Sequence, residues 1–216
     1  MISTLEPTTG FPRIPEDSVV LGRAETPMGA FGALFTARGL ACLSFPSDGL
    51  EGCRAWIGRR MRGAEIIQHH ASLGALGAQL TAYFEGSLHR FTVPLDLRGT
   101  PFHRDVWHAL LEIPYGEVRS YKEIARAIGR PHAVRAVGRA NHHNPVPIIV
   151  PCHRVIGSDQ TLTGYGGGLD LKERLLRLEG VLLAGKSAKS SFASRAHPTT
   201  IGHLCYEDSC NDASCP

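Results

Sequence analysis

The stretch that most constrains this chain is an apolar run that carries reactive side chains, "PVPIIVPCHRVIG". Cys152, His153 and Arg154 stand side by side in it, although their neighbours have the composition of a protein core. In an extended strand, neighbouring side chains point to opposite faces, so the thiol and the imidazole need a bend in order to act together. Pro147 and Pro151 interrupt regular backbone hydrogen bonding, and we therefore predict non-regular backbone here.

The cysteines of the chain divide by their surroundings in the sequence. A thiol becomes a good nucleophile when its pKa is lowered by a cationic group, a helix N-terminus or a basic partner. Cys152 has an imidazole and a guanidinium directly after it, which makes it the candidate nucleophile. Burial as an inert residue is the commoner fate of a single cysteine, and we predict it for Cys42 and Cys53.

Two short helices are predicted ahead of the cysteine run. In "SYKEIARAIG", Ser120 is placed to cap a helix with Glu123 three residues later, and Gly129 stands where that helix ends. The stretch "HAVRAVGRANHH" follows and has an apolar face made by Val134 and Val137. Two helices joined by a tight turn describe a helix-turn-helix, although many helical hairpins share the pattern.

Basic residues are concentrated in the same segment. Between residues 119 and 139 they are Arg119, Lys122, Arg126, Arg130, Arg135 and Arg139, against Glu123 as the one acidic residue. A stripe of this kind suits phosphate groups, and it equally suits a solvated helix face. The formal net charge of +3 is too small to indicate a nucleic-acid partner by itself.

The first hundred residues have a different pattern. Short β-friendly runs broken by Gly and Pro over residues 19–46 predict a small antiparallel sheet. Helices are expected in "EGCRAWIGRRM" and "LGALGAQLTAYFEG", the second with Leu76, Leu80 and Phe84 on one face, followed by a strand in "HRFTVPLDL". A second unit begins with "TPFHRDVWHALLEIP", whose apolar residues repeat at helical spacing.

No apolar run approaches the roughly 20 residues that a membrane-spanning helix needs, and no signal peptide is visible. We therefore expect the six cysteines to be reduced thiols of a cytosolic protein.

At this point the chain resembles a known family. The segments "GEVRSYKEIARAIGRPHAVRAVGRA" and "NPVPIIVPCHRVIGSDQTLTGYGGGLDLKERLLRLEG" are similar to the O6-alkylguanine-DNA alkyltransferases of direct DNA repair. The likeness is dense from about residue 100 to 183, and "PCHRV" followed by "TGYGGGLD" is highly specific. It implies an α+β fold, in which a small N-terminal domain with an RNase H-like sheet plus helix precedes a mostly helical domain with a winged-helix-like helix-turn-helix.

The resemblance implies a single-turnover repair reaction without a cofactor. Cys152 would accept the alkyl group from O6 of guanine, and possibly from O4 of thymine, as a stable thioether. His153 would act as a base through a bound water, with Glu179 fixing its tautomer. Tyr121 would donate a proton to the guanine ring, and Asn144 would lock the turn before the cysteine by side-chain-to-backbone hydrogen bonds.

The resemblance also implies a set of residues that bind DNA or the damaged base. Arg135 would fill the gap in the base stack after the target nucleotide is flipped out of the minor groove. Tyr165 and the backbone of Gly166 would cover the pocket, although the family commonly has serine at that glycine. The other residues assigned to this set are Ser120, Ala136, Arg154, Val155 and Lys172. The partner would be double-stranded DNA containing alkylated guanine, bound by a monomer in the bacterial cytoplasm or nucleoid, with no membrane.

Two further interpretations remain beside the alkyltransferase. One is a non-catalytic relative that binds alkylated DNA, which usually has tryptophan or alanine in place of the cysteine. The other is a transcription regulator that senses methylation, although no second DNA-binding module is visible in the sequence.

These inferences predict four segments: an N-terminal arm (1–16), an α+β domain (17–99), an alkyltransferase domain (100–184) and a disordered tail (185–216). The tail contains His203, Cys205, Cys210 and Cys215, whose gaps are wider than those of most zinc sites. Adjacent histidines, as in 69–70 and 142–143, diverge on a regular element, so no metal site is expected.

Overall fold

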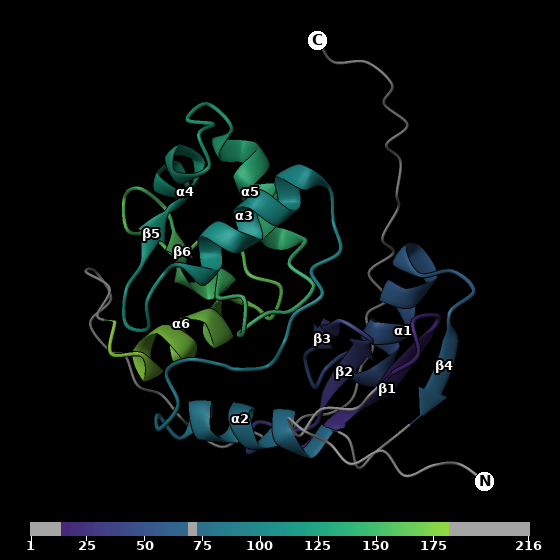
Figure 1. Cartoon of the computed structure of the whole chain (residues 1–216). Coiled ribbons are helices and arrows are strands. Elements are labelled where there is room, and N and C mark those ends of the chain that lie inside the picture. The colour runs from purple at the N-terminus through teal and green to yellow at the C-terminus, as the bar shows by residue number, and fades with distance from the viewer. Residues whose placement is uncertain (1–13, 69–72, 182–216) are drawn as a thin grey trace, which may run out of the picture. The chain divides into compact units, whose positions relative to one another are not determined.

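The computed structural model describes residues 14–68 and 73–181 (Figure 1). The elements of its first half are β1 (Ser18–Ala24), β2 (Phe31–Thr36), β3 (Gly39–Ser44), α1 (Gly49–Arg60), β4 (Glu65–Gln68) and α2 (Gly74–Phe84). Those of its second half are α3 (Pro101–Leu111), β5 (Arg119–Ser120), α4 (Tyr121–Ala127), α5 (Val134–His142), the 3₁₀ turn η2 (Cys152–Arg154), β6 (Val155–Ile156) and α6 (Leu169–Leu178). Among these helices, none has the length and apolarity to cross a bilayer.

The strands of the first half form one four-stranded sheet in the order β3-β2-β1-β4. The pairs β1–β2 and β2–β3 are antiparallel, as predicted, whereas β4 pairs with β1 in parallel. The sequence did not indicate β4, which is only four residues long. A parallel neighbour needs a crossover connection, and α1 supplies it between β3 and β4.

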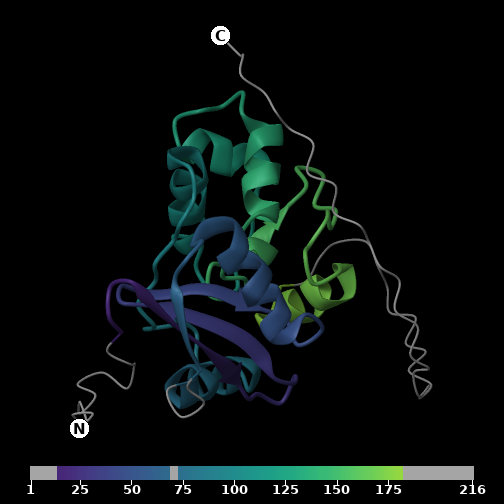
Figure 2. The same cartoon turned by 90° about the vertical axis from the view of Figure 1, so that its right-hand side faces the viewer.

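Each face of this sheet is covered by a helix, and alternation along the strands decides which side chains lie on each face (Figure 2). Val19 and Leu21 of β1 pack with α1, whereas Val20 and Ala24 pack on the α2 side. Both Ala41 and Cys42 of β3 contact the α1 cluster, because Ala41 is an extra residue at a β-bulge opposite β2. The predicted burial of Cys42 and Cys53 is confirmed.

The strand predicted over "HRFTVPLDL" is wrong. Residues 94–96 lie against the edge of β3, where Leu40 N donates to Pro94 O at 2.8 Å and Asp96 N donates to Leu40 O at 2.9 Å. The pairing stops at one isolated bridge, between Leu40 and Leu95. Pro94 has no N–H and cannot continue a ladder, so this segment covers the sheet edge as a connector.

The predicted helices of the second half are present. Ser120 and Glu123 form the capping box at the start of α4, with Glu123 N donating to Ser120 Oγ at 3.2 Å and Ser120 N donating to Glu123 Oε2 at 2.7 Å. Gly129 follows α4 at a φ of +71°, a left-handed conformation that glycine adopts without strain. Trp107 of α3 donates its indole N–H to Ala140 O at 2.8 Å, which fixes α3 against α5.

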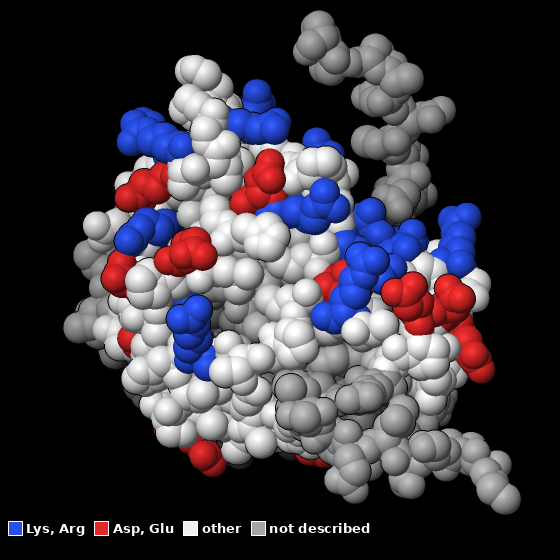
Figure 3. Space-filling model, viewed as in Figure 1, with Lys and Arg blue, Asp and Glu red and all other residues white. Residues whose placement is uncertain are grey.

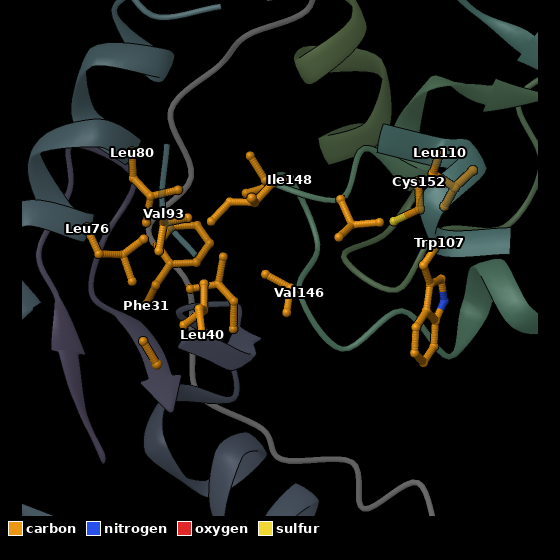
Figure 4. Packing of buried hydrophobic residues seen from close by; sticks show 14 of the residues in the cluster. Phe31, Leu40, Leu76, Leu80, Val93, Trp107, Leu110, Val146, Ile148 and Cys152 are labelled. Carbon is orange, nitrogen blue, oxygen red and sulfur yellow. The ribbon is translucent and has the colours of Figure 1, made fainter. Parts of the chain in front are cut away.

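The two halves share one hydrophobic cluster. Figure 4 shows Val146 and Ile148 between the sheet residues Phe31 and Leu40 and the neighbourhood of Cys152. In addition, Leu43 N on β3 donates to Pro145 O at 2.8 Å. The segment that leads to the cysteine is therefore held by both halves of the chain.

The short ladder of β5 with β6 completes the frame of the site. Ser120 pairs with Ile156, just after η2, and Tyr121 begins α4 directly after β5. Two residues of ladder thus bring the start of α4 next to the turn that carries Cys152.

Candidate active site

Cys152 begins a tight turn, so the predicted bend is confirmed. The backbone forms a 3₁₀ turn over η2, preceded by Ile148 at a φ of +73°, an unfavourable conformation for a β-branched residue. Asn144 holds this segment as expected, since its Nδ2 donates to Val150 O at 2.8 Å and its Oδ1 accepts from Val146 N at 3.0 Å. A strained conformation persists when its surroundings fix it, and these bonds do so.

The residue after the cysteine, His153, forms a buried pair with Glu179. Nε2 of His153 donates to Oε1 of Glu179 at 2.8 Å, and neither side chain is exposed. Arg154 donates from Nε to Oε2 of the same carboxylate at 2.9 Å and from Nη2 to Oε1 at 3.0 Å. Burial by itself would raise the pKa of Glu179, but the hydrogen bonds from His153 and Arg154 outweigh it and lower the pKa to about 2. The carboxylate is therefore ionised.

The thiol and the imidazole are both neutral at rest. Burial raises the pKa of Cys152 to about 11, against the opposing effects of Asn144 and Lys172. Burial likewise lowers the pKa of His153, although Glu179 acts in the opposite direction. Both side chains are therefore uncharged near pH 7.

A small pocket opens in front of the thiol. It is lined by Phe45, Asn141, His142, Asn144, Pro147, Cys152, Gly164, Tyr165 and Gly166. The hydroxyl of Tyr165 is buried without a hydrogen-bond partner among the described residues, and burial raises its pKa well above the usual range. Tyr121 is not among the residues that line this pocket, and its hydroxyl accepts from Thr163 Oγ1 at 3.1 Å.

Comparison with known proteins agrees with this chemistry. The family model described as "6-O-methylguanine DNA methyltransferase, DNA binding domain" matches residues 101–181. A methylated-DNA–protein-cysteine methyltransferase from Methanosarcina barkeri is 57% identical over 116 residues, which are 54% of this chain and 73% of that relative. This chain belongs to the methylated-DNA–protein-cysteine methyltransferase family. A Mycobacterium tuberculosis (strain ATCC 25618 / H37Rv) relative with the same name is 66% identical over 101 residues, which are 47% of this chain and 61% of that relative.

A solved structure of the methyltransferase family extends the likeness to the first half of the chain. The crystal structure of M. tuberculosis OGT in complex with DNA superposes with a TM-score of 0.63 and 46% identity, covering 74% of this chain and 92% of that one. The predicted mixture of a small sheet and helices is therefore confirmed as a mixed α/β architecture.

Some residues that the methyltransferase resemblance assigned to DNA lie at the surface. Arg135 and Ala136 are exposed on α5, and Gly166 is exposed at the rim of the pocket. Figure 3 shows basic side chains over the region of α4 and α5. The hydroxyl of Ser120, in contrast, is bonded to Glu123 in the capping box.

Three other residues of that set lie in the interior of this structure, where they bond to groups of the protein itself. Val155 is fully buried on β6, and Arg154 is bound to Glu179 and to Ile113 O, the latter at 2.6 Å. Lys172 is fully buried, and its Nζ donates to Val155 O at 2.6 Å and to Thr163 O at 3.0 Å. Buried charges need such partners, and the partners of Arg154 and Lys172 are carboxylate and carbonyl oxygens of the protein.

Sequence reasoning missed two polar residues of the site. Tyr83 of α2 donates its hydroxyl proton to Glu179 Oε1 at 2.6 Å, and Asn141 of α5 lines the pocket and donates to Cys152 O at 3.4 Å. Both stand on the buried face of their helix, Tyr83 at helical spacing from Leu76 and Leu80. A polar group at a core position needs a partner, and that was the available signal.

The remaining predictions concern metal sites and the chain termini. The rings of His142 and His143 diverge with an interplanar angle of 89°. Among residues 14–68 and 73–181, no group of three or more potential ligands could hold a metal ion. Several predictions fall outside the described residues. They concern residues 1–13 of the arm, the whole tail, and the possible ligands His69, His70, His203, Cys205, Cys210 and Cys215.

Proposed function

We propose that this protein repairs DNA by transferring an alkyl group, chiefly methyl, from O6 of guanine to Cys152. The observation that supports this most is the position of the thiol. Cys152 lines a pocket, with the His153–Glu179 pair directly behind it, in a chain whose relatives are named for transfer to cysteine. The reaction would be direct-reversal repair, and the protein would be consumed once per lesion.

The reaction needs a base, a nucleophile and an acid. His153 would take the thiol proton through a bound water, and Sγ of Cys152 would attack the alkyl carbon as its bond to O6 breaks. The guanine leaves as an anion, and Tyr121 would neutralise it by donating its phenol proton to a ring nitrogen. A thioether offers no leaving group that water can displace, so the product does not turn over.

Binding would use α5. The target atom lies inside a stacked duplex, so the nucleotide must be flipped out, and the exposed Arg135 would occupy the gap. In this proposal α4 and α5 form a winged-helix-like helix-turn-helix that enters the minor groove, and the N-terminal sheet is RNase H-like. The protein would act as a monomer in the compartment that holds the DNA. Phosphate contacts would make binding fall steeply with salt.

The pocket loop would act as a lid over the flipped base. Tyr165 packs edge-on against Phe45, with ring centroids 5.8 Å apart, and the exposed Gly166 offers its backbone N–H near the thiol. Lys172 would support the lid from inside, because it joins Thr163 O of the loop to Val155 O beyond the cysteine turn.

A single-turnover labelling experiment tests this proposal. The protein, in excess, is incubated with duplex DNA carrying one radiolabelled O6-methylguanine, and one label per lesion should move to protein. A non-catalytic binding protein would retain the DNA without moving label. A methylation sensor would move label and then change its affinity for a particular DNA sequence, whereas a repair protein would not.

A further inference from the structure

Tyr83 reaches the site from the other half of the chain. It is fully buried on α2, and its hydroxyl donates to Oε1 of Glu179 at 2.6 Å. The same oxygen accepts from Nε2 of His153 at 2.8 Å, and the Tyr83 hydroxyl lies 3.3 Å from that nitrogen. Tyr83, Glu179 and His153 therefore form a closed triangle of polar atoms.

We propose that Tyr83 is a positioning residue for alkyl transfer, whose hydroxyl holds His153 in the tautomer that leaves Nδ1 free to act as the base. This inference rests on the proposed function, because it assigns a role to the same imidazole.

Counting protons supports the tautomer. An ionised carboxylate has no proton, so the proton between Tyr83 and Glu179 belongs to the phenol. The phenol oxygen then has a lone pair left to face Nε2 of His153. Lone pairs of the Tyr83 hydroxyl and of the Glu179 carboxylate both face Nε2, so the neutral ring of His153 must carry its proton on Nε2. Nδ1 of His153 is buried and has no hydrogen-bond partner among the described residues, so its lone pair is unused.

The Tyr83 hydroxyl also shares the charge of Glu179. The carboxylate receives further donors from Arg154 and, at 3.3 Å, from Gly116 N. Each donor takes up part of the charge that would otherwise stabilise a protonated imidazole. Removing one should therefore strengthen the attraction between Glu179 and His153 and raise the pKa of His153.

The other groups that face His153 do not change in such a variant. They are Lys172 on α6, Arg154 and Cys152 on its own turn, and Tyr165, whose ring centroid lies 6.5 Å from that of the imidazole. In the intact protein, burial lowers the pKa of His153 against the effect of Glu179. The imidazole must be neutral to accept a proton, so a raised pKa moves the acid limb of the rate profile to higher pH.

The aromatic packing of Tyr83 allows a clean substitution. Its ring lies among Phe84, Phe91 and Tyr115, at centroid distances of 5.5, 5.3 and 6.2 Å, so phenylalanine keeps these contacts. Tyr115 gives a matched control, because its hydroxyl donates to Leu178 O at 2.9 Å and makes no hydrogen bond to the side chains of His153 or Glu179.

The test compares Tyr83→Phe with Tyr115→Phe in the full chain. Tyr83→Phe should slow single-turnover transfer from O6-methylguanine duplex about ten-fold at pH 7, a fraction of what general-base catalysis supplies. Its acid limb should move to higher pH, with duplex affinity unchanged. Tyr115→Phe should leave the acid limb in place. A Tyr83→Phe rate and acid limb like those of the intact protein would overturn the proposal, as would a slower rate that only parallels a lower melting temperature.

A second measurement needs no variant and no catalysis. Nitrogen-15 NMR of the histidine rings in the intact protein should show His153 as the neutral Nε2–H tautomer at pH 7. An Nδ1–H tautomer or a protonated ring would overturn the role of Tyr83. An intact protein that moves no label from DNA would instead overturn the proposed function, and the NMR result would still decide the tautomer.

Discussion

Two regions of the molecule contain buried cysteines. Cys42 and Cys53 lie between the sheet and α1, whereas Cys152 lies in the turn η2, and the surroundings of the thiols differ. Cys42, Cys53 and Cys152 are each at most 5% exposed. Around Cys42 and Cys53 the packed residues are apolar, and the Cys53 thiol lies 3.1 Å from the Ser44 hydroxyl. Cys152, in contrast, has an imidazole–carboxylate pair behind it and a pocket in front.

The thiols of the first region perturb each other. The hydrogen bond with Cys53 raises the pKa of Cys42, and burial raises it further. The same hydrogen bond lowers the pKa of Cys53. Among the residues that the structure describes, no basic side chain is hydrogen-bonded to either thiol, and neither thiol lines the pocket at Cys152. A shifted thiol pKa therefore does not by itself identify an alkyl acceptor, and our proposal relies instead on a neighbouring base and an open pocket.

The largest expected effect separates the two regions directly. Cys152→Ser should reduce alkyl transfer at least about 1,000-fold, as removal of a catalytic nucleophile does, while affinity for duplex DNA stays near that of the intact protein. Cys53→Ser should transfer at the normal rate. Quenched single-turnover assays and gel-shift titrations measure both. Undiminished transfer by Cys152→Ser would remove the distinction between the regions.

Arg135→Ala and Tyr121→Phe should fail at different steps, each with a loss on the order of ten- to a hundred-fold on duplex. Arg135→Ala lacks the group proposed to fill the vacated stack, so duplex repair should slow while reaction with free O6-methylguanine base changes little. Tyr121→Phe lacks the proton donor, so both substrates should slow. If Arg135→Ala slows the free base equally, Arg135 does not act in flipping.

Removal of the Cys53 thiol should lower the free energy of unfolding more than removal of the Cys152 thiol does, although only the latter should abolish alkyl transfer. Cys53→Ala removes a fully buried atom from a closed apolar layer and should cost about 1–2 kcal/mol of unfolding free energy. Cys152→Ala removes an atom that faces a pocket, so it should cost less. Urea unfolding of the two variants gives both values. A greater loss for Cys152→Ala would show that its turn depends on the thiol for packing.

The smallest expected effect is on the pH dependence of folding. His153 has a lowered pKa in the folded protein, so below the unfolded value of 6.5 the unfolded chain binds a proton that the folded one does not. Stability should therefore fall as pH decreases from 7 to 5.5, above the range in which Glu179 titrates. His153→Gln should flatten this slope in thermal melts, whereas the Cys53→Ala variant should keep it.

The features that the residue pattern predicted depend on neighbouring residues, whereas the pairing of Glu179 with His153 was expected only from the family resemblance. The bend at Cys152, the bonds of Asn144 and the capping box of Ser120 each involve side chains a few positions apart, and all three are confirmed. The missed contact of Tyr83 joins residues 96 positions apart. The interior positions of Arg154 and Lys172 likewise depend on which carbonyls and carboxylates the fold brings to them. Local pattern carries no information on such pairings.

Mapping the transferred group decides whether the surroundings of Cys152, and not burial, define the acceptor. The intact protein is reacted with duplex containing O6-methylguanine, digested and analysed by peptide mass spectrometry. The expected result is one added methyl group, on the peptide containing Cys152, with Cys42 and Cys53 unmodified. A methyl group on Cys42, Cys53 or one of the tail cysteines, with Cys152 unmodified, would contradict the account.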